Sequence, residues 1–299
     1  MIDKLNPLIS IIIPTYNREI ELNFAVNSIL DQTYKNWELI IVDNNSSDGT
    51  DNLIKKFNDS RITLLKIINN GVIASSRNKG IKESNGKYLA FLDSDDWWLP
   101  NKLMKCVDRI NNSKDGIDLI YHSLYISNKR KNIYTFKKIF ARQLLMPVFK
   151  DLILNNNPIA TSSVLVSKEI VKKAGAFSED KSLIAAEDYD LWLRISKLTD
   201  KFESIKAPLG FWFDGGNTSS PLLTLKYLDT LRKIHIDPLI LKTRKKLPVW
   251  WLYSKGRSLF LINDYKEAKI YLKKVFLRNS NLSVKIKSLY MLTKIYFFK

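Results

Sequence analysis

The chain has 299 residues, of which 45% are hydrophobic and 26% are charged, and this composition is typical of a globular protein. Its one cysteine, Cys106, excludes an internal disulfide and fits a reducing compartment. No apolar run approaches the roughly 20 residues that span a bilayer, and the apolar stretch 8–13 is too short for the core of a signal peptide. These features predict a cytoplasmic protein.

The net charge of +18 is concentrated toward the C-terminal end. Residues 226–299 contain 18 lysines and arginines against 4 acidic residues, so this tail carries a net charge of +14. Such a cationic region indicates an anionic partner, which could be a membrane surface, a nucleic acid or a phosphorylated lipid. Nucleic acid is the least favoured of the three, because the sequence contains no recognised nucleic-acid-binding module.

The first hundred residues alternate between strand-like and helix-like segments. Strands are expected at residues 8–13, 37–43, 62–67 and 87–93, and helices at 19–30, 48–57 and 74–82, with Ser46 or Ser47 as a cap of the second helix. This repetition with short turns predicts an α/β fold whose sheet is mostly parallel and has helices on both faces.

The remainder of the chain is mixed and then helical. Residues 102–110 and 187–198 read as helices, and residues 118–126 read as a strand. The basic tail is amphipathic and helical. Its small and apolar residues between 256 and 272 have the spacing of one tetratricopeptide helix pair, although one pair does not establish a repeat.

An acidic run follows the fourth expected strand. Asp93, Asp95 and Asp96 lie at its carboxyl end, where open α/β sheets bind their ligands. Three crowded carboxylates are costly unless a positive charge lies among them, and a hard divalent cation prefers oxygen ligands. The run therefore indicates a cation site that could in turn hold a diphosphate.

Polar residues also follow the first two strands. Residues 14–17 come after the first strand and Asp43 ends the second, so all three groups fall at one rim of the sheet. The segment after Asp43 could be only a polar turn with a helix cap. The coincidence of three polar strand ends favours a shared ligand. Arg77, early in the next helix, could offer a cation to a phosphate or a base, or could be solvated.

A second acidic pair begins the helix expected at 187–198. The N-terminus of a helix stabilises negative charge, which tends to keep Asp188 ionised near neutral pH. An ionised carboxylate in a cleft can act as a general base. Simple helix capping by Glu187 and Asp188 is an equally good interpretation of this segment alone.

Five sequence blocks, taken together and in order, resemble the inverting nucleotide-sugar glycosyltransferases of family 2, which have the GT-A fold. The blocks are SIIIPTYNR at 10–18, VDNNSSDGT at 42–50, RNKG at 77–80, FLDSDDW at 91–97 and EDYDLW at 187–192. The resemblance covers about residues 8–220. It implies a glycosyltransferase domain at 1–220, followed by a helical basic region at 221–299.

The resemblance also implies where a UDP-sugar donor would bind. The nucleotide-sugar would be bordered by residues at strand ends and on the adjacent helix: Pro14, Thr15, Tyr16, Asn17, Asp43, Arg77, Asp93 and Asp96. Asp43 would bind the uracil with Arg77 near it, and Asp93 would lie by the ribose and the sugar. Asp96 would support the metal or the donor sugar.

For the metal and the chemistry, the resemblance implies that Asp95 binds Mn²⁺ or Mg²⁺, which bridges the diphosphate. Asp188 would be the catalytic base, and Glu187 would contact the acceptor or position the base. The chain departs from the family pattern where relatives often carry a histidine before Gly-Asn-x-Ser. Asp214 stands there and could be a hard-metal ligand, and Trp212 replaces a cation.

The overall pattern resembles bacterial O-antigen transferases that extend a sugar on undecaprenyl diphosphate. It implies a lipid-linked saccharide acceptor, with glucose and GlcNAc-diphosphoundecaprenol as best guesses, and peripheral contact with the inner face of the plasma membrane. The alternatives are a transferase for another sugar or for a capsular glycan, and a non-catalytic relative that binds nucleotide-sugars. The aromatic stretch 247–253 beside Arg244 and Lys245 could lie on a membrane or in the core of a helical subdomain.

Overall fold

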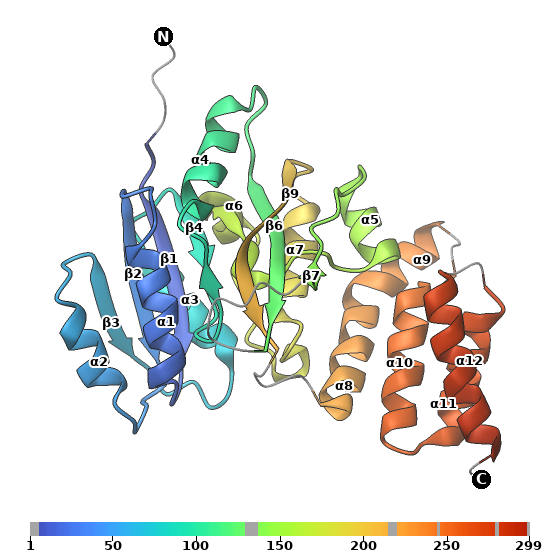
Figure 1. Cartoon of the computed structure of the whole chain (residues 1–299). Coiled ribbons are helices and arrows are strands. Elements are labelled where there is room, and N and C mark those ends of the chain that lie inside the picture. The colour runs from blue at the N-terminus through green and yellow to red at the C-terminus, as the bar shows by residue number, and fades with distance from the viewer. Residues whose placement is uncertain (1–5, 129–136, 215–219, 244–245, 279–280, 298–299) are drawn as a thin grey trace.

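The computed structural model describes residues 6–128, 137–214, 220–243, 246–278 and 281–297. A single twisted sheet occupies one side of the molecule, and helices cover both of its faces (Figure 1). A group of helices built from the C-terminal residues stands beside it. The segment 215–219, which holds the family's Gly-Asn-x-Ser position, and the basic pair 244–245 lie outside the described residues.

Four parallel strands and three connecting helices form the first half of the fold, as the sequence predicted. The strands are β1 (Ile9–Thr15), β2 (Trp37–Asp43), β3 (Ile62–Lys66) and β4 (Tyr88–Phe91), and the helices are α1 (Glu19–Leu30), α2 (Thr50–Phe57) and α3 (Ile73–Glu83). They lie in the order β3-β2-β1-β4. The carboxyl ends of these strands therefore meet at one edge of the sheet.

The second half of the sheet mixes directions. Its strands are β5 (Trp97–Trp98), β6 (Leu119–Ser127), β7 (Lys138–Ile139), β8 (Leu165–Ser167) and β9 (Phe202–Phe213). Its helical segments are α4 (Lys102–Asn112), α5 (Val148–Asn155), the 3₁₀ turns η1 (Thr161–Ser163) and η2 (Lys181–Leu183), α6 (Lys168–Lys173) and α7 (Glu187–Ser196). Strand β8 runs antiparallel between β4 and β6, and β9 is parallel to β6.

Strand β1 is buried along its length because both of its faces are covered. Ile9, Ile11 and Ile13 pack with α1, α2 and α4 on one face of the sheet. Ile12 points to the other face, where α3 and α7 pack. This is the alternation that a strand imposes on successive side chains, and it gives the sheet one core on each side.

Helix α2 begins differently from the prediction. Its N-cap is Gly49, and the side chain that bonds the first turn belongs to Asp48, which accepts the Thr50 amide at 3.1 Å. Neither Ser46 nor Ser47 caps the helix. Both serines are used instead in contacts between the loops that follow β1 and β2.

The C-terminal region is helical, with α8 (Pro221–Leu231), the π-helical turn η3 (Arg232–Ile236), α9 (Asp237–Thr243), α10 (Val249–Leu261), α11 (Tyr265–Phe276) and α12 (Leu282–Phe297). The aromatic stretch 247–253 packs inward at its centre. Trp251 is fully buried, and the Trp250 indole donates to the Ile153 carbonyl at 2.8 Å. One continuous core therefore joins α10 to α5, and these two tryptophans are not a surface for lipid.

Gly80 lets α3 approach β1 closely. A Cβ atom at this position would lie 2.6 Å from Cγ2 of Ile12, inside the fully buried strand. Because Ile12 has no room to retreat, a larger residue must push α3 away from the sheet.

We predict that Gly80→Ala lowers the free energy of unfolding by about 1–3 kcal/mol, as overpacking of a core does. Urea unfolding of this variant beside Lys82→Ala, an exposed change on the same helix, measures the effect. Equal unfolding midpoints for Gly80→Ala and the wild type would contradict this packing.

Candidate active site

A cavity of about 370 Å³ opens at the carboxyl edge of β1, β2, β3 and β4. It is lined by residues from the loops that follow these strands and from the start of α3: Pro14, Thr15, Tyr16, Arg18, Asn44, Asn69, Gly71, Ile73, Ser76, Asp93, Ser94 and Asp95. The predicted strand ends therefore do converge on one space. Its volume and its many polar groups suit a polar small molecule.

Some of the predicted donor residues line this cavity and others do not. Those on its wall are Pro14, Thr15, Tyr16, Asp93 and Asp95, whereas Asn17, Asp43, Arg77 and Asp96 are not. The sequence interpretation missed the contributions of Asn69 and Gly71, which follow β3. A polar segment after the third strand was the available signal, because its carboxyl end lies at the same edge.

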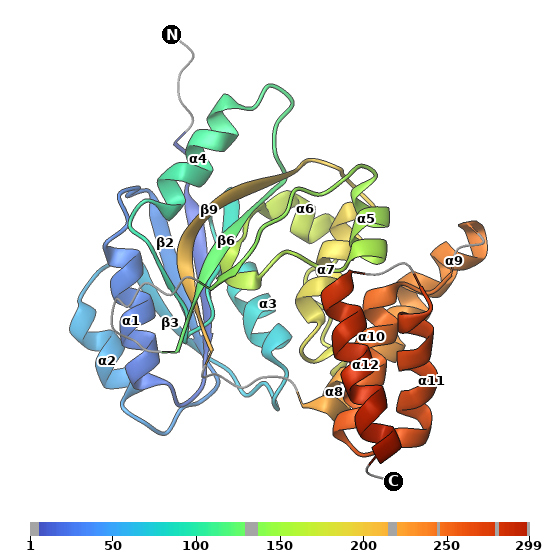
Figure 2. The ribbon, with the colours of Figure 1, turned by 45° about the vertical axis from the view of Figure 1, so that its right-hand side comes forward.

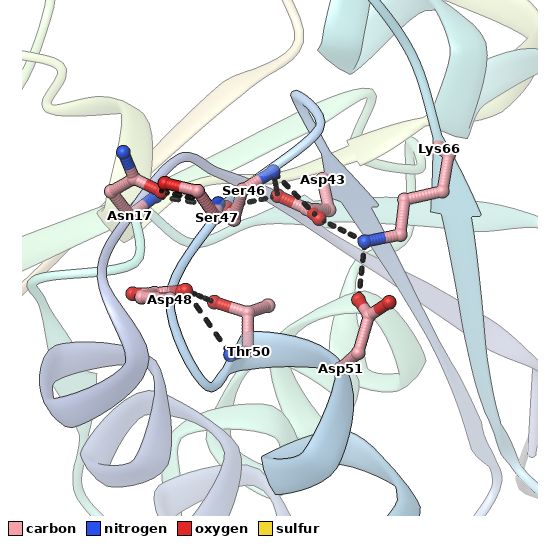
Figure 3. Close-up of polar contacts among 8 residues, drawn as sticks. All are labelled: Asn17, Asp43, Ser46, Ser47, Asp48, Thr50, Asp51 and Lys66. Atoms are coloured by element: carbon pink, nitrogen blue, oxygen red, sulfur yellow. Dashed lines mark hydrogen bonds and ion pairs between the residues drawn. The ribbon is translucent and has the colours of Figure 1, made fainter.

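The loops after β1 and β2 are tied together by side chains (Figure 3). Asn17 adopts a left-handed backbone with φ of 48°, and its side chain accepts the Ser47 amide at 2.8 Å. The Asn17 amide in turn donates to Ser46 Oγ at 2.8 Å. Left-handed backbone is easiest for glycine and asparagine, which explains the residue type at this corner. Asn17 thus shapes the rim.

Asp43 is fully buried and already has partners on both oxygens (Figure 3). Oδ1 accepts the Ser46 amide at 3.1 Å, and Oδ2 accepts Lys66 Nζ at 2.5 Å. Lys66 also pairs with Asp51. The lysine offsets the charge of a carboxylate that would otherwise be costly to bury. Contact between Asp43 and a uracil stays a prediction.

The acidic run holds its three carboxylates in different ways. Asp95 faces the cavity and pairs with Arg18 at 3.3 Å. Asp96 points inward, where it accepts the Phe213 amide at 2.9 Å. Burial and the charge of Asp93 raise the pKa of Asp95, although Arg18 acts against this. Burial and both neighbouring carboxylates raise the pKa of Asp96 well above its usual range.

The raised pKa values of Asp95 and Asp96 reflect burial and repulsion among the carboxylates, and a bound cation would reduce that repulsion. Among the described residues, no cluster of three or more His, Cys, Asp or Glu side chains forms a ready-made metal cage. Mg²⁺ is usually held by one or two carboxylates together with substrate phosphates, and Asp95 supplies one accessible hard oxygen group beside the cavity. The donor set therefore fits Mn²⁺ or Mg²⁺ bound together with a diphosphate.

Asp214 lies on the segment that Asp96 anchors. The amide of the preceding residue, Phe213, donates to Asp96, and the Asp214 amide donates to the Ser127 carbonyl at 2.8 Å. Its side chain is exposed. The backbone thus brings Asp214 to the neighbourhood of the acidic run, and its role as a metal ligand stays a prediction.

Arg77 links the acidic run to the second acidic pair. Its guanidinium is 3% exposed and donates to Asp93 Oδ1 at 2.8 Å and to Glu187 Oε1 at 2.7 Å. Burial acts to lower the pKa of Arg77, but the two carboxylates outweigh it and raise the pKa. The sequence interpretation placed Arg77 beside the nucleotide. The structure places it behind the cavity, as a buried bridge between two acidic segments.

Asp188 lies in the first turn of α7 and is only partly buried, unlike Glu187 beside it. Its Oδ2 accepts the Thr161 hydroxyl at 2.7 Å, and its Oδ1 accepts the Tyr189 amide at 2.6 Å. Burial and the charge of Glu187 raise its pKa to about 6, against the lowering effects of Thr161 and Arg77. The expected lowering by the helix N-terminus is therefore outweighed. At pH 7 the group is still mostly ionised, roughly ten to one.

The turn η1 contacts both acidic segments, and the sequence interpretation did not find it. Thr161 bonds Asp188, while Ser162 Oγ accepts the Asp93 amide at 3.1 Å. The Ser162 carbonyl also accepts the Trp98 indole at 2.7 Å. A Thr-Ser-Ser turn before a strand looks like an ordinary loop, so the local sequence carries little signal for this role.

A second missed pair holds α7 from behind. His235, on the π-helical turn η3, lies 2.7 Å from Asp190 through Nε2, and both side chains are buried. Arg194 also pairs with Asp190 at 2.7 Å. The C-terminal helices therefore fix the helix that carries Asp188.

We predict that Arg77→Met lowers the free energy of unfolding by about 3 kcal/mol, because it leaves Glu187 as an unpaired buried charge. Adding Glu187→Gln to that variant removes the unpaired charge and should restore part of the loss. Urea unfolding of the single and double variants measures both effects. A single variant as stable as the wild type, or a double variant no more stable than the single, would contradict the bridge.

Comparisons with known proteins agree with this geometry. The sequence profile described as Glycosyl transferase family 2 matches residues 10–164, just over half of the chain. The chain is 35% identical over 193 residues to UDP-Glc:alpha-D-GlcNAc-diphosphoundecaprenol beta-1,3-glucosyltransferase WfgD of Escherichia coli, covering 64% of this chain and 70% of that protein. It is 43% identical over 101 residues to the putative teichuronic acid biosynthesis glycosyltransferase TuaG of Bacillus subtilis, covering 33% of this chain and 40% of TuaG.

Solved structures with the same fold cover nearly the whole chain. S. aureus TarS 1-349 in complex with UDP-GlcNAc aligns with a TM-score of 0.59 at 16% identity, over 96% of this chain and 90% of that one. The mannosyltransferase PcManGT of Pyrobaculum calidifontis, in complex with GDP-Man and Mn²⁺, aligns with a TM-score of 0.57 at 15% identity, over 97% and 81%. The fold is the GT-A fold of glycosyltransferases, with a helical C-terminal region. The chain belongs to glycosyl transferase family 2.

Proposed function

We propose that this glycosyltransferase is metal-dependent and inverting, and that it moves glucose from UDP-glucose to a GlcNAc-diphosphoundecaprenol acceptor. The observation that carries the reaction type is the bridge through Arg77, whose two terminal nitrogens join the acidic run to the Glu187–Asp188 pair. The acidic run suits a departing diphosphate, and the Glu187–Asp188 pair suits an attacking hydroxyl.

The donor side binds the leaving group. The cavity walls around Thr15, Tyr16 and Asn69 would hold the nucleoside, and Asp95 would hold Mn²⁺ or Mg²⁺. The bound cation supplies Lewis acidity that offsets the negative charge of the departing diphosphate. Arg18 pairs with Asp95 and also lines the cavity. When Asp95 binds the metal ion, Arg18 can therefore turn to contact the diphosphate.

The acceptor side removes a proton. Asp188 would take it from the acceptor hydroxyl as that oxygen attacks the anomeric carbon. A base works best when its pKa lies near the working pH, and burial together with Glu187 gives Asp188 a pKa of about 6. The Thr161 hydroxyl and the Tyr189 amide each hold one of its oxygens and so fix the orientation of the carboxylate. Direct displacement through an oxocarbenium-like state inverts the anomeric centre, so an α-linked donor gives a β-linkage.

The choice of substrates rests on the relatives. WfgD and WfaP of Escherichia coli, each 35% identical to this chain over the aligned part, are both named for transfer of glucose from UDP-Glc to GlcNAc-diphosphoundecaprenol. A role in surface polysaccharide synthesis at the inner face of the bacterial plasma membrane follows from such an acceptor. A screen of UDP-sugars against a synthetic GlcNAc-diphospho-lipid, with mass detection, tests these identities. Transfer of another sugar in preference to glucose would overturn the donor assignment.

We predict that Asp95→Asn and Asp188→Asn each lower the turnover number at least about a hundredfold, because each removes a charge that acts in the transition state. Release of UDP, measured with added Mn²⁺, reports the effect. Asp108→Asn, an exposed change on α4, is the matched control and should retain full activity. Retained transfer in both folded site variants would overturn the mechanism.

We predict that activity falls as the pH drops through about 6, because protonated Asp188 cannot accept a proton. Thr161→Val removes a hydrogen bond that favours the ionised form, so this limb of the profile should move upward by about one pH unit. The variant should then be several-fold slower than the wild type near pH 6.5 and nearly equal at pH 9. Thr243→Val, an exposed change on α9, should leave the profile unchanged. An unshifted limb in Thr161→Val would contradict this role.

A further inference from the structure

The last helix has apolar residues on two faces, and only one face is packed. Met291, Leu292 and Ile295 are buried against α10 and α11. A second stripe is exposed, and its members are Leu282, Ile286, Leu289, Tyr290, Tyr296 and Phe297. Each of them lies three, four or seven residues from another member, which puts all six on one side of the helix. Figure 2 shows α12 at the front of the helical group, with no described element over it.

Lysines surround this exposed stripe, which we name the α12 face. Lys285, Lys287 and Lys294 lie on α12 itself, and α12 contains no acidic residue. The Lys294 ammonium lies 4.9 Å from the centre of the Tyr290 ring, and Lys269 of α11 lies 4.2 Å from that of Tyr296. Apolar and aromatic side chains bordered by long cationic ones are the composition of helices that lie in a membrane interface.

We propose that the α12 face is the surface through which this protein lies on an anionic lipid bilayer. The proposal deepens the proposed function, on which it rests for the lipid-linked acceptor. Among the described residues, no helix is long and apolar enough to cross a bilayer. Helix α12 would therefore lie parallel to the membrane, with Tyr290 and Tyr296 at the depth of the head groups.

Charge decides between lipid and a second copy of the chain. A symmetric pairing of two α12 faces would bring lysines against lysines, with no carboxylate on α12 to offset them. An anionic bilayer attracts each of these lysines instead, and the tail as a whole carries a net charge of +14. Lipid is therefore the occupant that this face fits.

The position of α12 suits a membrane-bound acceptor. Its C-terminal end lies at the same end of the molecule as the carboxyl edge of β1 and β2, where the cavity opens (Figures 1 and 2). The tryptophans at 250 and 251, which the sequence offered as membrane anchors, are used in the core. Contact with lipid would thus come from a helix that the composition of the tail alone does not single out.

Sedimentation of the full chain with vesicles that contain no sugar acceptor tests the surface independently of turnover. We expect binding to vesicles of phosphatidylglycerol and phosphatidylcholine in equal parts, and much weaker binding to phosphatidylcholine alone or at about 1 M salt. Ile286→Ser with Tyr290→Ser should lower binding at least about tenfold. Lys287→Gln with Lys294→Gln should also lower it about tenfold.

The matched control is Leu145→Ser with Leu198→Ser. These residues are 66% and 53% exposed, similar to Ile286 at 58% and Tyr290 at 57%, but they lie outside the tail. The control should bind vesicles like the wild type. Wild-type binding that the α12 variants retain would overturn the proposal. A concentration-dependent dimer in gel filtration that Ile286→Ser with Tyr290→Ser converts to monomer would overturn it in favour of self-association.

The two proposals fail in different ways. Transfer to a water-soluble, short-chain GlcNAc diphosphate needs no membrane, so the α12 variants should keep wild-type turnover with it. Wild-type turnover with that acceptor but no vesicle binding would overturn the α12 face alone. Vesicle binding through α12 with no turnover on any acceptor would support the face and overturn the proposed function.

Discussion

The buried ion bridge through Arg77 is the constraint on which the rest of the site depends. A guanidinium that is 3% exposed must have partners, and those it has are carboxylates from two distant segments, Asp93 and Glu187. Replacing either carboxylate leaves charge unbalanced in a region of low dielectric. The bridge therefore fixes the distance between the end of β4 and the start of α7. Gly80 serves the same end, because it lets α3 carry Arg77 close against β1.

Further hydrogen bonds from η1 and from the C-terminal helices also hold the two acidic segments in place. In turn η1 the Thr161 hydroxyl donates to Asp188 and the Ser162 hydroxyl accepts the Asp93 amide, so one turn contacts both acidic segments. From the other side, His235 holds Asp190 of the same helix. The C-terminal helices thus support the helix that carries Asp188, in addition to presenting the α12 face. Val284 of α12 packs against the same core that holds the buried residues of α7.

The sequence predicted the parallel half of the fold almost element by element, because each buried strand there is an apolar run followed by a short turn. It also singled out Asp95 and Asp188, since carboxylates at element boundaries stand out, and the roles of both residues stay predictions. It did not predict Thr161 or His235, whose roles depend on partners that only tertiary folding brings near. The sequence likewise did not reveal that the pKa of Asp188 is raised, although the group stays mostly ionised at pH 7 as expected. Helix position is visible in sequence, whereas burial beside Glu187 is not. Trp251 shows the same limit, because core and interface aromatics have the same local pattern.

In the proposed mechanism, a base at Asp188 and a leaving-group site at Asp95 act from opposite sides of one anomeric carbon. Stereochemistry reports this arrangement directly, because a single displacement inverts the centre and a double displacement retains it. The decisive measurement is the NMR coupling constant of the anomeric proton in the product formed from an α-linked UDP-sugar. The arrangement predicts a β-linked product, and an α-linked product would contradict it.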